Sequence, residues 1–423
     1  MVLAQLVTDK RAGNIGHIAD HNEMSRRLRN SADFASIQGA INEQSTTYIP
    51  EGQYVLDTSV LLTRDNLTLV GAGIGKTILD FSACENVNAG GYTNPGHCYG
   101  AVTIDSLVNG SPLKNITIKD MTIKTSVVAR GAGFHPVLVG AVDNCITENI
   151  EVDGSIGEAI YHEDNRGKLS RRWVVRGCQI SNHQMSAINS NDPELRDALI
   201  TQNYIRDGAN GIVMVGLGGQ IINNVLERIT DYGILVLCES PYSGVFLEDY
   251  IIAGNVIRDT GIGNTNRPRY GITAVLSGED MGLIVSNNII SNMHEVAGMP
   301  CYAIRSSGNM TISNNLIRGA IGQAGESVGI AIAAGSKDNV SNSSIVGNRV
   351  ESSASATRYT WGILISNEVL SDGAHLVGNH VAVGAITDTG YSFRDERGKS
   401  NCIGNVFGAQ YIYGGQTLPA GIK

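Results

Sequence analysis

Two short segments carry acidic side chains that could act together on one substrate. Ala159-Ile-Tyr-His-Glu-Asp164 aligns residue by residue with Ala187-Ile-Asn-Ser-Asn-Asp192. If these segments lie on neighbouring strands, ~4.8 Å apart, Asp164 lies over Asp192, with Glu163 and His162 beside them. Glycoside hydrolysis requires two carboxyl groups ~5–10 Å apart, one of them protonated. The alignment therefore predicts a hydrolytic site.

Other charged residues extend this candidate site. A third matching segment, Gly233-Ile-Leu-Val-Leu-Cys-Glu239, also ends in an acid, so we predict Glu163, Asp164, Asp192 and Glu239 as the catalytic set. Arg166 next to these carboxylates would suit a lyase reaction instead. Acids at strand ends can also be solvated surface residues. Hydrolysis, elimination and no catalysis all stay open.

Two polar segments, 259–269 and 292–300, are typical of long loops and would wall a groove. Arg267 and Arg269 suit anionic sugars, and His294 and Glu295 could assist them. The predicted substrate-binding residues are His162, Arg166, Arg267, Arg269, His294 and Glu295.

These residues need a repeating scaffold, and the sequence contains one. Asn followed by a short aliphatic run recurs at intervals of 21 to 33 residues, and between these phrases lies a second one, such as Tyr270-Gly-Ile-Thr-Ala. The recurring asparagines are Asn203, Asn224, Asn255, Asn288, Asn315, Asn348, Asn379 and Asn405. A residue repeated this often indicates a structural ladder, because Asn tolerates left-handed backbone and its amide can bond to the same residue one coil away.

Each repeat holds about three short strands without a helix between them. The repeat length is that of solenoid proteins. Leucine-rich repeats would need a leucine frame, and propeller blades would need four strands. We therefore predict an all-β fold, a single-stranded right-handed parallel β-helix of about a dozen coils, spanning residues 50–412 and followed by a tail, 413–423.

The N-terminal region differs from the repeats. Residues 31–49 predict a capping helix, with Asp33 as N-cap and Phe34, Ile37 and Ile41 on one face, which would cover the exposed edge of the first coil. Residues 1–30 are polar and basic, which favours an attachment segment that becomes ordered on a partner. His17, Asp20 and His21 in it lack a third strong ligand at good spacing, so we predict no metal and no cofactor.

The segment Val70-Gly-Ala-Gly-Ile-Gly-Lys-Thr77 looks like a phosphate-binding loop but does not match one. That motif requires a glycine at the position of Val70 and must open a helix. Here a strand-like run, Ile78-Leu-Asp-Phe81, follows it. The glycines instead predict a corner of an early coil, packed under the capping helix.

Composition narrows the class of protein further. The net charge of −9 gives no basic footprint for nucleic acid or anionic lipid. The seven cysteines are scattered, which is typical of small buried residues in a chain made in a reducing cytosol. There is no apolar run typical of a signal peptide or of a membrane-spanning helix. We expect a protein made in the host cytoplasm that does not insert into a membrane.

Residues 33–81 resemble the opening coils of the pectate-lyase-like right-handed β-helix superfamily. The matching positions follow the patterns Pro-x-Gly-x-Tyr, Leu-x-Gly-x-Gly and Thr-x-Leu: Pro50, Gly52, Tyr54, Leu69, Gly71, Gly73, Thr77 and Leu79. With the repeats, the resemblance covers roughly residues 33–410. It implies fold more than function, because the superfamily contains lyases, hydrolases, epimerases and non-catalytic spikes.

The segment Gly16-His-Ile-Ala-Asp-His-Asn-Glu-Met24 is similar to an N-terminal segment of phage structural proteins. Together the two resemblances imply a bacteriophage virion spike, of tailspike or head-spike type. Such a spike is a homotrimer that binds, and in some members depolymerises, host surface polysaccharide. It would attach to phage tail or capsid proteins through residues 1–30. A non-catalytic capsid decoration protein and a stand-alone polysaccharide lyase or epimerase are the two alternatives.

Overall fold

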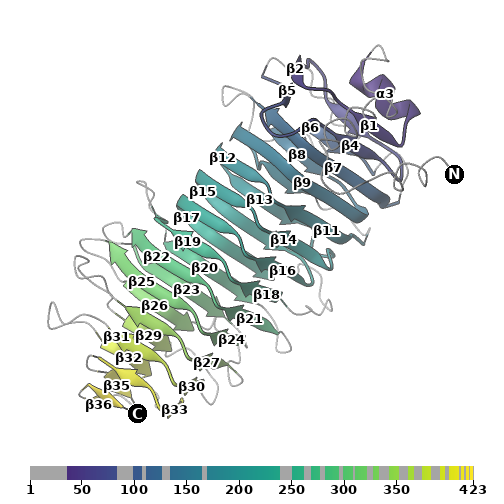
Figure 1. Cartoon of the computed structure of the whole chain (residues 1–423). Coiled ribbons are helices and arrows are strands. Elements are labelled where there is room, and N and C mark those ends of the chain that lie inside the picture. Colours follow the sequence, from purple (N-terminus) through teal and green to yellow (C-terminus); the bar gives the residue numbers. More distant parts are fainter. Residues whose placement is uncertain are drawn as a thin grey trace, which may run out of the picture.

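The computed structural model describes the chain as one long rod (Figure 1). The described residues are 36–82, 99–106, 111–125, 134–163, 169–238, 250–261, 268–276, 282–294, 299–307, 310–321, 327–332, 343–351, 361–365, 374–382, 391–395, 400–408, 411–413, 416–418 and 420–422. Its strands wind into a right-handed parallel β-helix, which confirms the predicted fold.

Three strand columns, which we name faces A, B and C, run along the rod. Face A consists of β1 (Thr46–Tyr48), β4 (Thr68–Val70), the first halves of β7 (Leu113–Lys124) and β9 (Val142–Ser155), β11 (Arg171–Arg176), β14 (Ala198–Thr201), β16 (Gly219–Ile222), β18 (Tyr250–Ala253), β21 (Leu283–Ser286), β24 (Met310–Ser313), β27 (Ser344–Val346), β30 (His375–Val377) and β33 (Asn401–Ile403).

Face B follows face A in every coil. It consists of β2 (Gly52–Val55), β5 (Thr77–Asp80), the second halves of β7 and β9, β12 (Gln179–His183), the first halves of β15 (Tyr204–Val215) and β17 (Val225–Cys238), β19 (Val256–Arg258), β22 (Ile289–His294), β25 (Leu316–Ile321), β28 (Arg349–Glu351), β31 (His380–Ala382) and β34 (Val406–Phe407).

Face C completes each coil. It consists of β3 (Val60–Leu62), β6 (Tyr99–Ile104), β8 (Phe134–Val139), β10 (Ile160–His162), β13 (Ser186–Asn191), the second halves of β15 and β17, β20 (Arg269–Leu276), β23 (Cys301–Ser307), β26 (Ser327–Ile332), β29 (Trp361–Ile365), β32 (Tyr391–Asp395) and β35 (Tyr411–Tyr413). All neighbours within the three columns pair in parallel, and face A counts thirteen coils among the described residues, close to the dozen expected.

Alternation of side chains across each strand builds the core. In β18, Tyr250 and Ile252 are buried inside the rod while Ile251 and Ala253 lie outside. One continuous hydrophobic core of this kind extends from Ile37 to Phe407. Because each strand is short, the core is filled mostly by one or two branched side chains per face and coil.

The predicted asparagine ladder is present at the corner between faces A and B. All eight predicted asparagines are buried. The backbone N–H and the side-chain amide of Asn203 both donate to Oδ1 of Asn224, at 3.0 and 2.9 Å, and the same pattern repeats down the rod. Cys178 occupies the preceding position, and its N–H donates to Oδ1 of Asn203. The ladder is therefore structural, as predicted.

One detail of the ladder differs from the prediction. The left-handed backbone belongs to the residue before each ladder asparagine, as at Asn287 (φ 56°) before Asn288 and at Gly254 (φ 67°) before Asn255. The ladder asparagine itself does not have left-handed backbone. In each repeat its amide forms hydrogen bonds with buried backbone groups.

The N-terminal helix, α3 (Ile37–Glu43), covers the first coil. Ser36 is the N-cap and its side chain accepts from the N–H of Gly39; the predicted cap, Asp33, and Phe34 lie outside the described residues. Ile37 and Ile41 are buried as predicted. The amide of Gln38 bonds to both the N–H and the C=O of Leu61 in β3, at 2.8 and 3.0 Å, so the helix satisfies backbone groups of an edge strand.

The other end of the rod is closed by the tail. β36 (Gln416–Leu418) pairs antiparallel with β35, and β37 (Gly421–Ile422) pairs antiparallel with β34. These two strands cover the edge of the last coil. The residues predicted as a tail therefore fold back onto the β-helix.

The glycine-rich segment is the predicted coil corner, between β4 and β5. A Cβ on Gly71 would lie 2.3 Å from the carbonyl oxygen of Asp120, so this position needs glycine. The corner packs on β7 of the next coil, where the N–H of Gly75 donates to Oγ1 of Thr122 at 2.9 Å, and the capping helix packs on β1 and β3. Lys76 is exposed. Among the described residues, no helix is long and apolar enough to cross a membrane.

Candidate functional site

The register predicted for the acidic segments is confirmed where the structure describes it. Ile160 pairs with Ile188 and His162 pairs with Ser190 on neighbouring coils. Glu163 follows β10 and is partly exposed. Asp164 and Arg166 lie outside the described residues, so their position over Asp192 stays a prediction.

Asp192 is buried and belongs to the framework of its own turn. Its Oδ1 accepts the N–H of Glu194 at 2.9 Å, and its backbone carbonyl accepts the N–H of Leu195. A carboxylate used in this way fixes the chain after β13. The structure therefore corrects the prediction of Asp192 as an acid that faces a substrate.

His162 points into the core of the rod. Its ring lies 5.2 Å from the ring of Trp173, and its Nδ1 lies 3.8 Å from Oδ2 of Asp192. Burial lowers the pKa of His162 to about 3, so the imidazole is neutral at ordinary pH. A fully buried ring cannot contact a glycan outside the rod, which corrects its prediction as a substrate-binding residue.

Arg269 is also buried. Its Nη1 donates to Oδ1 of Asp231 at 2.5 Å and to the carbonyl oxygen of Thr230 at 2.7 Å. Burial lowers the pKa of its guanidinium, and the charge of Asp231 opposes this shift. Arg269 therefore anchors the corner between faces B and C and does not reach a substrate, which again corrects the prediction.

His294 is the predicted substrate-binding residue that the structure leaves accessible, with 30 % of its side chain exposed. Nε2 of its ring lies 3.8 Å from Oδ1 of Asp259, and its backbone N–H donates to the carbonyl oxygen of Thr260. Arg267, Glu295 and the predicted catalytic Glu239 lie outside the described residues, so these three assignments stay predictions.

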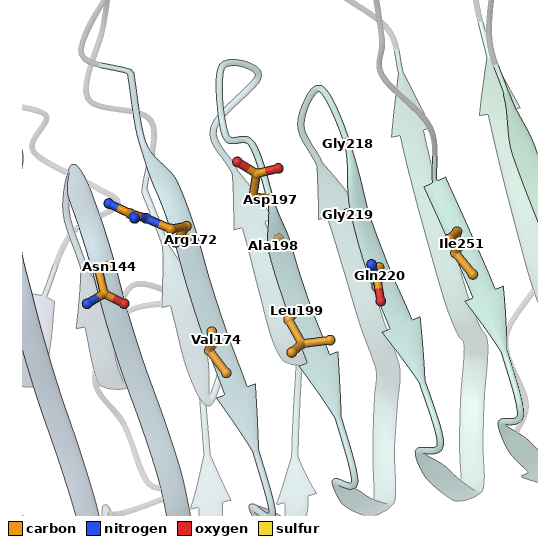
Figure 2. A pocket seen from close by; sticks show the side chains of 10 residues that line it. All are labelled: Asn144, Arg172, Val174, Asp197, Ala198, Leu199, Gly218, Gly219, Gln220 and Ile251. Atoms are coloured by element: carbon orange, nitrogen blue, oxygen red, sulfur yellow. The ribbon is translucent and has the colours of Figure 1, made fainter.

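A groove on the outside of face A, which we call the face-A groove, was not predicted. It has a volume of about 700 Å³ and crosses β9, β11, β14, β16 and β18 (Figure 2). Its lining residues are Asn144, Arg172, Val174, Asp197, Ala198, Leu199, Gly218, Gly219, Gln220 and Ile251.

The face-A groove is long because it crosses five adjacent strands. It runs along the rod axis, with about 4.8 Å between successive strands. Gly219 contributes no side chain, and a Cβ there would lie 2.9 Å from the carbonyl oxygen of Ala198. Gly219 pairs with the buried residues Ala198 and Tyr250, so this position faces the core of the rod.

Polar and apolar side chains line different parts of the groove. Asn144, Arg172 and Asp197 lie toward the strand starts, and Val174 and Leu199 lie farther along the strands (Figure 2). Arg172 forms an ion pair with Asp143, and 59 % of its side chain is exposed. Amide, guanidinium and carboxylate groups bond to hydroxyls, while the aliphatic side chains offer an apolar floor.

The groove contains few groups that could transfer a proton. Asp197 is the one carboxylate among its lining residues, whereas a glycosidase site needs two. Among the described residues, no cluster of His, Cys, Asp and Glu is suited to a metal ion.

A second polar cluster that the sequence reasoning missed lies at the start of face C. His135 Nδ1 lies 3.1 Å from Oε2 of Glu158, and the His135 ring contacts the tilted ring of Tyr161, with centroids 4.5 Å apart. Asn189 donates to Oε1 of Glu158 at 3.3 Å. Burial is the largest single influence and acts to raise the pKa of Glu158, but the hydrogen bonds from His135, Asn189 and the backbone, together with the charge of His135, lower that pKa overall.

The signal for this pair was present in the repeat. His135 stands two residues before Val137, and Glu158 stands two residues before Ile160; Val137 and Ile160 pair across the coils. Aligning the strands of face C would have placed the two side chains together. A Cβ on Gly157 would lie 2.9 Å from Nδ1 of His135, so this glycine makes room for the ring.

Comparison with known proteins supports the fold. The family described as "Right handed beta helix region" matches residues 133–317. No curated protein matches the sequence. Among solved structures, the A-module of mannuronan C-5 epimerase AlgE6 from Azotobacter vinelandii is 17% identical with a TM-score of 0.58, covering 83% of this chain and 93% of that one.

Two further structures show the same architecture. PfbA, a surface adhesin of Streptococcus pneumoniae, is 13% identical with a TM-score of 0.59, covering 93% of this chain and 94% of that one. The catalytic domain of a GH87 alpha-1,3-glucanase, in complex with nigerose, is 15% identical with a TM-score of 0.56, covering 83% of this chain and 63% of that one. At these identities the likeness concerns the fold alone.

Proposed function

We propose that this protein is a virion spike that binds host cell-surface polysaccharide along the outside of its β-helix. The observation that carries the proposal is the face-A groove. It is open to solvent, runs along the rod and combines polar side chains at one edge with an aliphatic floor. A linear glycan has matching chemistry, with hydroxyls at its edges and C–H groups on its sugar faces.

The structural similarity to known β-helix proteins is consistent with this proposal. The structurally similar proteins include, by their names, a mannuronan epimerase and an alpha-1,3-glucanase, two enzymes named for polysaccharides. They have the same fold at low identity, so they make a glycan ligand reasonable without assigning one.

The spike role rests on the N-terminal resemblance. Residues 1–30, the proposed attachment segment for phage tail or capsid proteins, lie outside the described residues. As part of this proposal the spike is a homotrimer, and its location is the virion. Deleting residues 1–30 should abolish incorporation into the virion and leave the rod folded. Normal incorporation of the truncated chain would contradict the spike role.

Cleavage of the bound glycan is a separate step of the proposal. It would require carboxylates other than Asp197. Of the two predicted catalytic residues that the structure describes, Glu163 is partly exposed and Asp192 is buried. Asp164 and Glu239, outside the described residues, would complete the set. A non-catalytic capsid decoration protein would bind or ignore glycans without cutting them.

Binding to a panel of bacterial surface polysaccharides tests the proposal. Two variants suit the groove: Arg172→Asn and Asp197→Asn, because both positions have left-handed backbone (φ 53° and 56°) that Asn accepts. Loss of a charged hydrogen bond should weaken binding about 10- to 100-fold. Arg318→Asn on face B is the matched control, since Arg318 is also an exposed, ion-paired arginine.

The same incubation separates the enzymatic alternatives. New reducing ends indicate hydrolysis, and new ultraviolet absorbance together with new reducing ends indicates elimination. No retention of the wild-type chain on any glycan would contradict the proposal. Retention that both groove variants leave unchanged would place the binding site elsewhere.

A further inference from the structure

A row of outward side chains runs along face A and extends the floor of the face-A groove in both directions. Six successive coils contribute one residue each, and the strand register pairs each residue with the next. Figure 2 shows four of them in line across their strands. Five of the six are aliphatic, so we name them the aliphatic row: Ile146, Val174, Leu199, Gln220, Ile251 and Ile284.

The aliphatic row is contiguous and accessible from outside the rod. Its members lie on neighbouring strands ~4.8 Å apart, so the six of them span roughly 24 Å. Four members are partly buried, while Gln220 and Ile284 are exposed, Ile284 at 38 %. Threonines occupy the same position beyond both ends, Thr117 before Ile146 and Thr311 after Ile284. The row is therefore a bounded feature of face A.

The charged residues on the two sides of the first half of the row are paired. On one side Arg172 forms an ion pair with Asp143, and on the other side Nε of Arg176 lies 3.0 Å from Oε1 of Glu148. Farther along the row, the strands β14, β16, β18 and β21 contain no Asp, Glu, Lys or Arg. The row itself therefore offers apolar contact and not charge.

The apolar contact is aliphatic in kind. Among the described residues that line the face-A groove, none is aromatic. An aromatic ring offers a flat face on which a whole sugar ring stacks, whereas Val, Leu and Ile present separate methyl groups. Methyl groups of a ligand pack among these by dispersion contacts and by leaving water. In a bacterial surface glycan, such methyl groups belong to 6-deoxyhexoses and to O-acetyl substituents.

Gln220 distinguishes between apolar ligands. It interrupts the row near its middle, and its exposed amide forms no hydrogen bond within the described part of the chain. An acyl chain laid along the row would cover this amide without offering it a partner, which costs free energy. A glycan brings hydroxyl groups to the amide between its methyl groups. The interruption therefore favours a glycan over a lipid.

We propose that the aliphatic row binds the methyl groups of a glycan, those of 6-deoxyhexose residues or O-acetyl substituents, while the polar edge of the face-A groove bonds to its hydroxyls. The inference rests on the proposed glycan binding and names the class of glycan. It also lengthens the site beyond the groove, by Ile146 at one end and Ile284 at the other. Each methyl group that leaves water on binding strengthens it about 4-fold.

The polysaccharide that the wild-type protein retains from the glycan panel supplies the first test. Its repeating unit should contain 6-deoxyhexose or O-acetyl groups. Mild alkali removes O-acetyl groups and leaves the glycan chain intact, and a synthetic fragment with 6-hydroxyl groups of the same configuration replaces a 6-deoxyhexose fragment. In each such pair, the methyl-bearing member should bind at least about 4-fold more tightly than the methyl-free member.

Substitutions in the row locate the contact. Ile251→Thr keeps a β-branched side chain, and Thr311 already occupies the same column two coils on. This variant and Leu199→Thr should each weaken binding of the methyl-bearing ligand about 4- to 10-fold, and of the methyl-free ligand less than about 2-fold. Ile289→Thr is the matched control, because Ile289 is a 41 % exposed isoleucine on face B, and it should change neither affinity. Circular dichroism reports whether each variant is folded.

Four results would overturn the inference. A retained glycan without 6-deoxyhexose or O-acetyl groups does so, and so do equal losses of both ligands in Ile251→Thr; either result leaves glycan binding by the groove intact. Retention of no glycan by wild type overturns the proposed function as well. Binding to vesicles of phosphatidylethanolamine and phosphatidylglycerol that Gln220→Leu strengthens would identify an acyl chain as the occupant of the row.

Discussion

Oδ1 of Asn288 accepts two hydrogen bonds from Asn255, one from the backbone N–H and one from Nδ2, both at 3.0 Å. Nδ2 of Asn255 also donates to the carbonyl oxygen of Ile221, at 2.8 Å. One asparagine thus connects three coils. Both residues are buried, so no water replaces these bonds if a rung is lost.

Removing one rung should therefore be costly. Asn288→Ala leaves two donors of Asn255 buried without an acceptor, and each costs about 1–3 kcal/mol. We expect a loss of about 3–5 kcal/mol, measured as a lower urea midpoint. Asn287→Gly is the control, because Asn287 is exposed and its φ of 56° suits glycine. Equal midpoints for both variants would contradict a structural ladder.

The sequence predicted the repeat well because the repeat is a local pattern. The Asn phrase and the Gly-aliphatic phrase each mark one corner or strand, so fold, coil number and ladder follow from their recurrence. The register of Ile160 with Ile188 was confirmed for the same reason.

The side on which a residue lies could not be predicted equally well. In β20, Gly271 and Ile272 both face inward: a Cβ on Gly271 would lie 3.0 Å from the core residue Ile290, and Ile272 is buried. After two successive inward residues, the alternation of inward and outward side chains along the strand is shifted by one residue. Arg269 and His162 were expected at a substrate because of their charge and their acidic neighbours, and both are buried.

The face-A groove has no sequence motif at all. Its lining residues come from five successive coils, and no residue type recurs from one coil to the next. Only the register across coils brings Arg172, Asp197 and Gln220 together, and that register depends on corner lengths. A groove of this kind requires the three-dimensional structure.

The buried pair of Arg269 and Asp231 should behave as a structural unit. Arg269→Met leaves the Asp231 carboxylate buried without its partner, which we expect to cost about 3–5 kcal/mol of unfolding free energy. The double variant Arg269→Met with Asp231→Leu should recover most of that loss. Urea unfolding measures both. Glycan retention by the folded variants should be unchanged; a selective loss of binding would restore Arg269 as a substrate-binding residue.

Two buried histidines should make the rod sensitive to acid. Burial lowers the pKa of His162 to about 3 and that of His183 to about 4, whereas an unfolded histidine has a pKa of about 6.5. Below pH 6.5 the unfolded chain binds protons that the folded chain does not. Stability is therefore fully present above pH 6.5 and is lost as the pH falls.

By this argument the two histidines together lower the unfolding free energy by roughly 5–7 kcal/mol between pH 7 and pH 4, at about 1.4 kcal/mol per pKa unit. His162→Leu should remove about half of this pH dependence. His375→Leu, an exposed histidine on face A, should leave it unchanged. Urea midpoints at pH 7, 5 and 4 provide the measurement, and identical slopes for all three proteins would contradict the assignment.

The His135–Glu158 pair should act at lower pH. The pKa of Glu158 is lowered in the fold, so its contribution is present above about pH 4.5, the unfolded value, and is lost as the pH falls through the folded one. Glu158→Gln should reduce stability at pH 7 by about 1–3 kcal/mol, because His135 loses a charged partner. This penalty should shrink below pH 4.5, where the wild-type carboxyl is protonated too. Glu51→Gln, at an exposed acid, is the control. A penalty that is constant from pH 7 to pH 3 would show that Glu158 contributes shape and not charge.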